Sequence, residues 1–214
     1  MTAAGLENAA ARTRTRPRPT HNCAPHRTLV DISARDDYCG FPAADAWMAA
    51  FAVWSLAGEK REAACELFRR SVLINPNSAM ALTLGGWIET MRGNQRAGRQ
   101  MIERALLLNP RDPRGWFMSG AMAIAAIIDG NYLEAISWAE RALTQNRRFA
   151  VALRVLTVAL EKVGRHDRAA RVLRELLAIE PQLTISGFLA RIPVPLVSMA
   201  QTYAEALKAA GLPE

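Results

Sequence analysis

The sequence predicts an all-α protein, a right-handed solenoid of helical hairpins. Three prolines, Pro76, Pro110 and Pro181, are spaced 34 and then 71 residues apart, so that the second interval is about two repeats long. Four glycines recur at intervals of 35, 37 and 34 residues, namely Gly58, Gly93, Gly130 and Gly164. This period is typical of stacked helix-turn-helix units, and a glycine at each turn permits the positive φ that ends a first helix. The composition, 50% hydrophobic and 22% charged, agrees with a helical protein that buries a core.

Small and large apolar residues return with the same period. The positions five or six residues after each glycine hold Ala64, Gly98, Ala135 and Ala169. A larger side chain there would push the two helices of a hairpin apart. Large apolar residues that interlock between layers are expected in the first helices at Leu82, Trp116 and Leu153, and in the second helices at Phe68, Ile102 and Leu173. We expect Trp116 to be a main packing residue.

The runs NPNSAMALTLGGW, NPRDPRGWFMSGA and GNYLEAISWAERAL resemble the tetratricopeptide repeat. The resemblance implies four units within residues 44–181, each contributing two helices to a continuous surface that holds another protein. The fourth unit has Thr157 where the second and third units have Gly86 and Gly120, and Arg147 stands where a proline would end the third unit. The third unit has three additional residues, and the spacing predicts that they lie between Gly120 and Gly130 and lengthen its first helix or the turn after it.

A narrower resemblance covers the third and fourth units and the ending EALKAAGLPE. It is similar to the carboxy-terminal repeat region of alphaproteobacterial regulators, in which a class III adenylate or guanylate cyclase domain or a winged-helix domain precedes the repeats. Too few residues precede the array here for either domain. The alternative to a stand-alone scaffold is therefore a regulatory fragment that acts in bacterial cyclic-nucleotide signalling or transcription through a separate partner.

The two ends of the chain differ from the array. Residues 1–43 are rich in arginine, proline and threonine and predict a disordered tail. Its arginines could neutralise phosphates on nucleic acid or lipid, although a solvated tail is the simpler interpretation. Residues 182–214 predict an irregular connection and then a capping helix over about 196–210. The apolar stripe of that helix is Leu196, Met199, Tyr203 and Leu207.

Several classes of function lack the residues that they need. No nucleophile, base and acid combination or glycine-rich phosphate loop stands out, so we expect a protein that is not an enzyme and uses no cofactor. His21, Cys23 and His26 lie near one another but lack a fourth ligand, so no metal site is predicted. His166 follows a turn and is expected to be exposed. The longest uncharged run, 115–128, is too short to span a bilayer.

The cysteines and the absence of a secretory signal predict the compartment. Cys23, Cys39 and Cys65 form neither a CxxC motif nor an even disulfide framework, which favours reduced thiols in the cytoplasm. The net charge is +7, but the basic residues are spread along the chain. We therefore expect no specific nucleic-acid partner and no membrane span.

The concave surface is the predicted binding site, because in such arrays it is formed chiefly by the first helix of each unit. A spacing of i, i+3 and i+7 selects Met80, Thr83, Trp87, Arg114, Phe117, Ala121, Val151, Arg154 and Val158. This set predicts a groove that is apolar at its middle with two arginines beside it. We expect it to bind a peptide or helix of another protein, with Trp87 and Phe117 as anchors. Packing of both aromatic residues between helices, or self-association through the groove, are the open alternatives.

Overall fold

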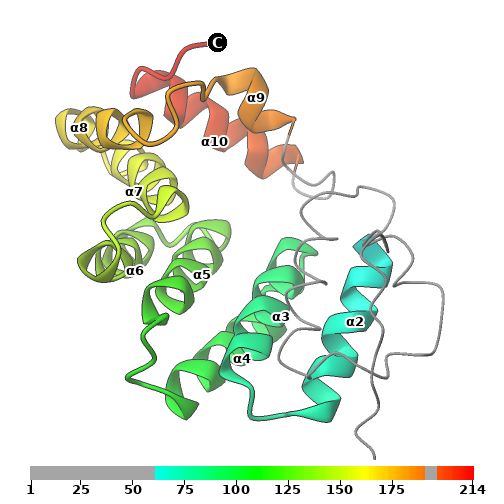
Figure 1. Ribbon diagram of the computed structural model, residues 1–214. Helices are drawn as coiled ribbons and strands as arrows, with labels where there is room; N and C mark the ends of the chain where they lie inside the picture. Colours follow the sequence, from blue (N-terminus) through cyan, green and yellow to red (C-terminus); the bar gives the residue numbers. More distant parts are fainter. Residues whose placement is uncertain (1–60, 191–196) are drawn as a thin grey trace, which may run out of the picture. The chain divides into compact units, whose positions relative to one another are not determined.

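The computed structural model describes residues 61–190 and 197–214, all within one compact unit of the chain (Figure 1). Every regular element in these ranges is a helix. The tail that the sequence predicts over residues 1–43, with His21, Cys23 and His26, lies outside the described residues, and so does the first helix of the first predicted unit. The all-α solenoid predicted from the sequence is confirmed for the described part.

Three helical hairpins follow one another along the chain. Their helices are α3 (Ala79–Met91) with α4 (Gln95–Leu108), α5 (Gly115–Ile128) with α6 (Tyr132–Gln145), and α7 (Ala150–Lys162) with α8 (His166–Leu177). Each hairpin packs on the next through its second helix, and the first helices α3, α5 and α7 also contact one another in sequence order. The helix α2 (Arg61–Ile74), a second helix by its position, packs against α3.

The turn inside each hairpin has the backbone conformation that the sequence predicts. Gly93, Gly130 and Gly164 have φ values of +93°, +74° and +75°, which residues with a side chain rarely adopt. A polar side chain caps the start of α3, where the Ser78 hydroxyl accepts from the backbone N–H of Ala81 at 3.3 Å. Gly93, Gly130 and Gly164 are therefore confirmed as helix stops, and the fourth predicted glycine, Gly58, lies outside the described residues.

The small residues of the second helices lie where the hairpins are closest. Ala135 and Ala169 are fully buried, and Gly98 of α4 faces Gly86 of α3. A Cβ atom at Gly86 would lie 2.5 Å from the carbonyl oxygen of Gly98, and one at Gly98 would lie 2.7 Å from the backbone nitrogen of Thr90. Real Cβ atoms do not approach backbone atoms so closely, so the α3–α4 pair requires both glycines.

The predicted place of the three additional residues in the third unit is wrong. The connection before α5 covers residues 109–114, whereas the connections before α3 and α7 cover only 75–78 and 146–149. Two additional residues therefore lie in that connection, and the third makes α5 one residue longer than α3 and α7. The register within α5 is consequently three residues away from the one read in the sequence.

This shift changes the role of two α5 residues. Counted back from the turn glycine, Ser119 aligns with Leu82 and Leu153, and all three are buried. Trp116 instead aligns with Ala79 and Ala150, and it is only half-buried. Trp116 is therefore not the fully buried packing residue that we expected.

The last helix, α10 (Val197–Ala209), packs against α7 and against the short helix α9 (Ile185–Leu189). Tyr203 and Leu207 of its predicted stripe are buried, while Leu196 and the side chain of Met199 are not among the described features. The ring of Phe188 stacks on Tyr203 with centroids 5.8 Å apart, and the backbone N–H of Ile185 donates to the carbonyl of Pro213 at 2.9 Å. These contacts cover the end of the last hairpin.

Candidate functional site

Equivalent positions on the first helices α3, α5 and α7 can be compared by counting back from the turn glycine of each hairpin. At thirteen, ten and six residues before the turn glycine, α3 has Met80, Thr83 and Trp87, and α7 has Val151, Arg154 and Val158. These six residues are the predicted set for the second and fourth units. Because of the register shift, the equivalent residues of α5 are Phe117, Gly120 and Ile124. Only Phe117 of the predicted α5 set lies on this surface, which we call the first-helix face.

Burial divides the predicted site residues into two groups. Met80, Thr83, Ala121 and Val158 are at most 7% exposed and pack inside the array. Ala121 lies in a core cluster with Ile102 and Met122 rather than on the first-helix face. Trp87, Phe117, Val151 and Arg154 are half-buried, and Arg114 is exposed at the residue that precedes α5. The buried residues support the face from below and cannot touch a partner while the array is folded.

Four aromatic rings gather on the first-helix face, and we call them the aromatic cluster. Trp87 and Phe117 have ring centroids 5.2 Å apart, which joins α3 to α5. Trp116 packs edge to face on Phe117 at 5.8 Å and on Phe149 at 4.8 Å. Such tilted and edge-on arrangements are the ones that aromatic pairs favour. The cluster therefore continues across three successive units.

Phe149 was not among the residues predicted from the sequence. It precedes α7 and lies over Gly120 of α5, where a Cβ atom at Gly120 would meet the Phe149 ring. The glycine thus leaves room for an aromatic ring of the next unit. A conspicuous glycine in the middle of an apolar helix was the available signal, but its spacing alone does not say which neighbour fills the space.

Both predicted arginines already have carboxylate partners in the chain. The Arg154 guanidinium lies 3.3 Å from Glu180 and also donates to the Ala150 carbonyl at 3.4 Å. Arg114 lies 3.2 Å from Asp112, whose side chain is only 2% exposed. An acidic group of a partner would therefore compete with a carboxylate of this protein at either arginine.

The Asp112 carboxylate is held by the connection that precedes α5. Burial acts to raise its pKa, but hydrogen bonds from the Arg114 side chain and backbone and from Asn109 outweigh burial and lower the pKa of Asp112 below its usual value. Asp112 is therefore ionised at neutral pH and fixes both the start of α5 and the position of Arg114.

Tyr203 of α10 lies at the other end of the first-helix face. Its side chain is buried, and burial raises the pKa of Tyr203 well above its usual value even though the positive charge of Arg154 opposes this shift. The phenol therefore stays neutral and packs as part of the buried contact of α10 with the array.

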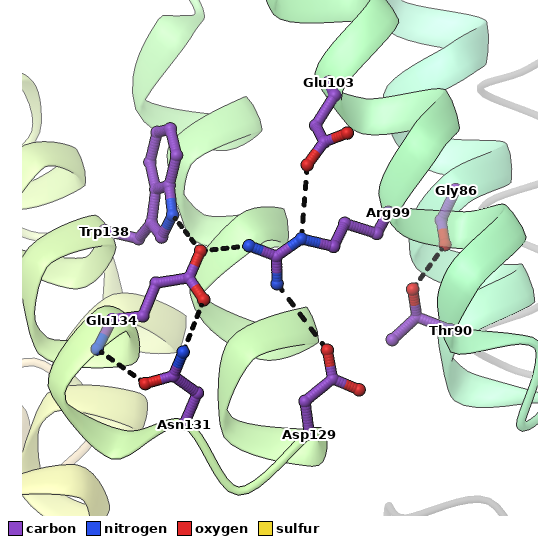
Figure 2. Close-up of polar contacts among 8 residues, drawn as sticks. All are labelled: Gly86, Thr90, Arg99, Glu103, Asp129, Asn131, Glu134 and Trp138. Carbon is purple, nitrogen blue, oxygen red and sulfur yellow. Dashed lines mark hydrogen bonds and ion pairs between the residues drawn. The ribbon is translucent and has the colours of Figure 1, made fainter.

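A second polar group joins the second helices of neighbouring units (Figure 2). Arg99 of α4 donates to Glu134 of α6, and it lies 3.6 Å from Asp129 and 3.2 Å from Glu103. Glu134 also accepts from Trp138 Nε1 at 3.1 Å and from Asn131 Nδ2 at 2.9 Å. Every polar group here is used within the chain, so the arrangement ties the second unit to the third.

The same contacts shift the two pKa values in opposite directions. The hydrogen bond to Glu134 raises the pKa of Arg99 despite partial burial. Burial acts to raise the pKa of Glu134, but hydrogen bonds from Arg99 and Trp138 outweigh it, and the net pKa is lowered. Both groups are therefore charged across the physiological range, as an ion pair that stabilises the packing requires.

Metal-binding side chains do not cluster in residues 61–190 and 197–214. No group of three or more His, Cys, Asp and Glu residues that could hold a metal ion occurs in these ranges. His166 is exposed, as expected, and its Nδ1 lies 2.6 Å from the buried Glu161 carboxylate. None of the helices described is both long enough and apolar enough to cross a bilayer.

Comparison with known proteins identifies the fold. No protein-family model and no curated protein sequence matches the chain. Among solved structures, the type IV pilus biogenesis factor PilW matches with a TM-score of 0.57 and 19% identity over 77% of this chain and 73% of its own. TTC0263, a thermophilic TPR protein of Thermus thermophilus, matches with a TM-score of 0.57 and 20% identity over 78% of this chain and 91% of its own.

A third match is a protein with a peptide-binding site. YrrB, a TPR protein with an unusual peptide-binding site, matches with a TM-score of 0.50 and 14% identity over 86% of this chain and 91% of its own. At these identities the likeness concerns the fold alone. The described chain therefore has the helical-hairpin solenoid fold of tetratricopeptide-repeat proteins.

Proposed function

We propose that this protein is a non-catalytic scaffold that binds a peptide or helix segment of another protein on its first-helix face, in the cytoplasm. The aromatic cluster carries the proposal, because half-buried rings from three successive units line one continuous face. Aromatic side chains supply much of the binding energy where proteins meet, and they lose little conformational freedom on binding. YrrB, with its peptide-binding site, has the same fold.

The contacts of the arginines refine what the partner should be. Arg114 and Arg154 are paired with Asp112 and Glu180, so a partner gains little from acidic groups that must displace these carboxylates. An apolar segment that packs on Trp87, Phe117 and the adjoining rings gains more. The role of the two arginines is then to limit the orientations of the segment rather than to anchor it.

Selection from a displayed library of helical and extended peptides tests this function with the full chain as bait. A selected peptide is synthesised, and its Kd is measured for the wild type and for Trp87→Ala and Phe117→Ala at a temperature where all are folded. We expect Kd to rise about tenfold or more in each variant. Arg171→Ala on α8 is the matched control, because Arg171 is exposed on a second helix. Equal losses in the control and in the face variants would overturn the proposal.

The association with a cyclase or winged-helix regulator stays a prediction of the sequence resemblance. A reading frame for such a domain directly beside the gene would support it. The scaffold function does not depend on the outcome, since either kind of protein would use the first-helix face to bind its partner.

A further inference from the structure

Two successive second helices end in large apolar side chains that point into solvent. They are Leu73 and Ile74 of α2, which are 81% and 69% exposed, and Leu107 and Leu108 of α4, which are 82% and 42% exposed. We call this set the leucine edge. Its residues lie at the C-terminal ends of second helices, whereas the aromatic cluster is formed by first helices and by the residue that precedes α7.

The two halves of the leucine edge are tied together by a hydrogen bond between units. Arg104 of α4 donates from Nη2 to the Asn77 side-chain oxygen at 3.2 Å, and Asn77 lies in the turn that follows Ile74. Arg104 itself is one turn of helix before Leu108. The exposed leucines of α2 and α4 therefore form one edge rather than two separate positions.

Positive charge surrounds these apolar side chains. Arg69, Arg70, Arg104 and Arg111 are all exposed on α2, on α4 or in the turn after α4. Glu66 balances part of this charge through contacts of 3.4 Å to both Arg69 and Arg70. Arg104 and Arg111 form no ion pair with a carboxylate of the described residues, and the one acid beside Arg111, Asp112, is buried and paired with Arg114.

This combination restricts what can cover the edge. A second copy of the chain would bring the same arginines together, and like charges oppose such a contact. Side chains that are more than four-fifths exposed do not lie in a pocket of this protein, so the partner must supply the apolar surroundings. A bilayer interface does so without a preformed cavity, and anionic headgroups match the arginines.

We infer that the leucine edge docks this protein peripherally on an anionic membrane surface. The exposed side chains of Leu73, Ile74 and Leu107 enter the boundary between headgroups and acyl chains, and Arg104 and Arg111 contact phosphate and carboxylate groups of the lipids. The site is distinct from the proposed partner-binding face, so the scaffold can hold a protein segment while it is at the membrane.

Flotation with vesicles tests the inference on the full chain. Wild-type protein is mixed with vesicles of phosphatidylcholine alone or of equal parts phosphatidylcholine and phosphatidylserine. We expect flotation with the anionic vesicles only, weakened by salt. The double variant Leu73→Gln/Leu107→Gln should bind about a hundredfold more weakly, because burial of each leucine contributes on the order of a tenfold change in affinity. Arg104→Gln/Arg111→Gln should lower binding mainly at low salt.

Matched controls distinguish binding through the leucine edge from nonspecific binding to vesicles. Leu133→Gln removes another exposed leucine, 65% exposed on α6, and Arg171→Gln removes an exposed charge on α8. Both should float like the wild type, and circular dichroism should show the same helicity for all variants. Wild-type binding by the double leucine variant would overturn the inference and assign the binding to charge elsewhere. Failure of the wild type to float would also overturn the inference, and an acidic protein would then be the better candidate to cover the leucine edge.

Discussion

Replacement of Gly98 by alanine tests the closest helix contact in the array. A Cβ atom at Gly98 would lie 2.7 Å from the backbone nitrogen of Thr90 and closer still to the Gly86 carbonyl. Both are backbone atoms of α3, so rotation of a side chain cannot relieve these two contacts. The helices α3 and α4 must then separate by several tenths of an ångström or more, and the buried contacts of Ile102 with α3 loosen with them.

Two opposing terms set the size of the effect. Alanine is a better helix former than glycine by about 1 kcal/mol, which favours the variant. Overpacking costs about 1–3 kcal/mol, and the rigid backbone contact places this case at the upper end or above. We therefore expect Gly98→Ala to lower the free energy of unfolding by about 2 kcal/mol. In an array of this size that is about 4–8 °C in Tm.

Urea denaturation and thermal unfolding by circular dichroism measure this effect. The matched control is Gly115→Ala at the start of α5, where the added Cβ atom would meet only the flexible end of Gln145 at 3.1 Å. It should leave Tm unchanged or raise it slightly, because the gain in helix propensity remains. A Gly98→Ala protein as stable as the wild type would refute the close packing of α3 on α4.

Two further results follow from the described contacts. Trp116→Ala should lower the free energy of unfolding by about 1–3 kcal/mol, because Trp116 is half-buried with two ring contacts. This loss is smaller than the about 3–5 kcal/mol that replacement of a fully buried tryptophan costs. Urea denaturation measures the loss, and either no change or a larger loss would contradict the packing of Trp116. Glu134 has a lowered pKa in the folded state, so its ion pair stabilises the protein above the unfolded-state pKa, near 4.3, and this stability is lost as pH falls through the folded-state value. Tm measured between pH 6 and about pH 3 should therefore fall less steeply for Glu134→Gln than for the wild type; parallel curves would show that the ion pair is absent.

The turns and hairpins of this protein could be predicted from sequence because their causes are local. A positive φ favours glycine at Gly93, Gly130 and Gly164 whatever surrounds them, so periodic glycines locate the turns. The register of α5 could not be read in the same way. Gly120 looks equivalent to Gly86, but Gly86 makes room for a helix of its own hairpin and Gly120 makes room for Phe149. The spacing of small residues does not reveal which neighbour needs the space.

The candidate site shows the same limit. The i, i+3, i+7 spacing selected matching positions on α3 and α7, because both helices have the same length from the turn. The ion pairs of Arg114 and Arg154 were not predictable, since Asp112 and Glu180 come from irregular connections whose path the helical period does not describe. The leucine edge is visible in the sequence as apolar pairs, but only burial tells exposed leucines from core leucines.

The position of Phe149 over Gly120 limits how far this array can be treated as a set of interchangeable modules. A repeat that is moved, deleted or used as the last unit takes its own helices with it, but the ring that fills the space above α5 belongs to the following unit. A shortened protein that ends after α6 would leave Gly120 and Trp116 without that ring. Evolution or design that recombines these units must therefore exchange the third unit together with the first residues of the fourth.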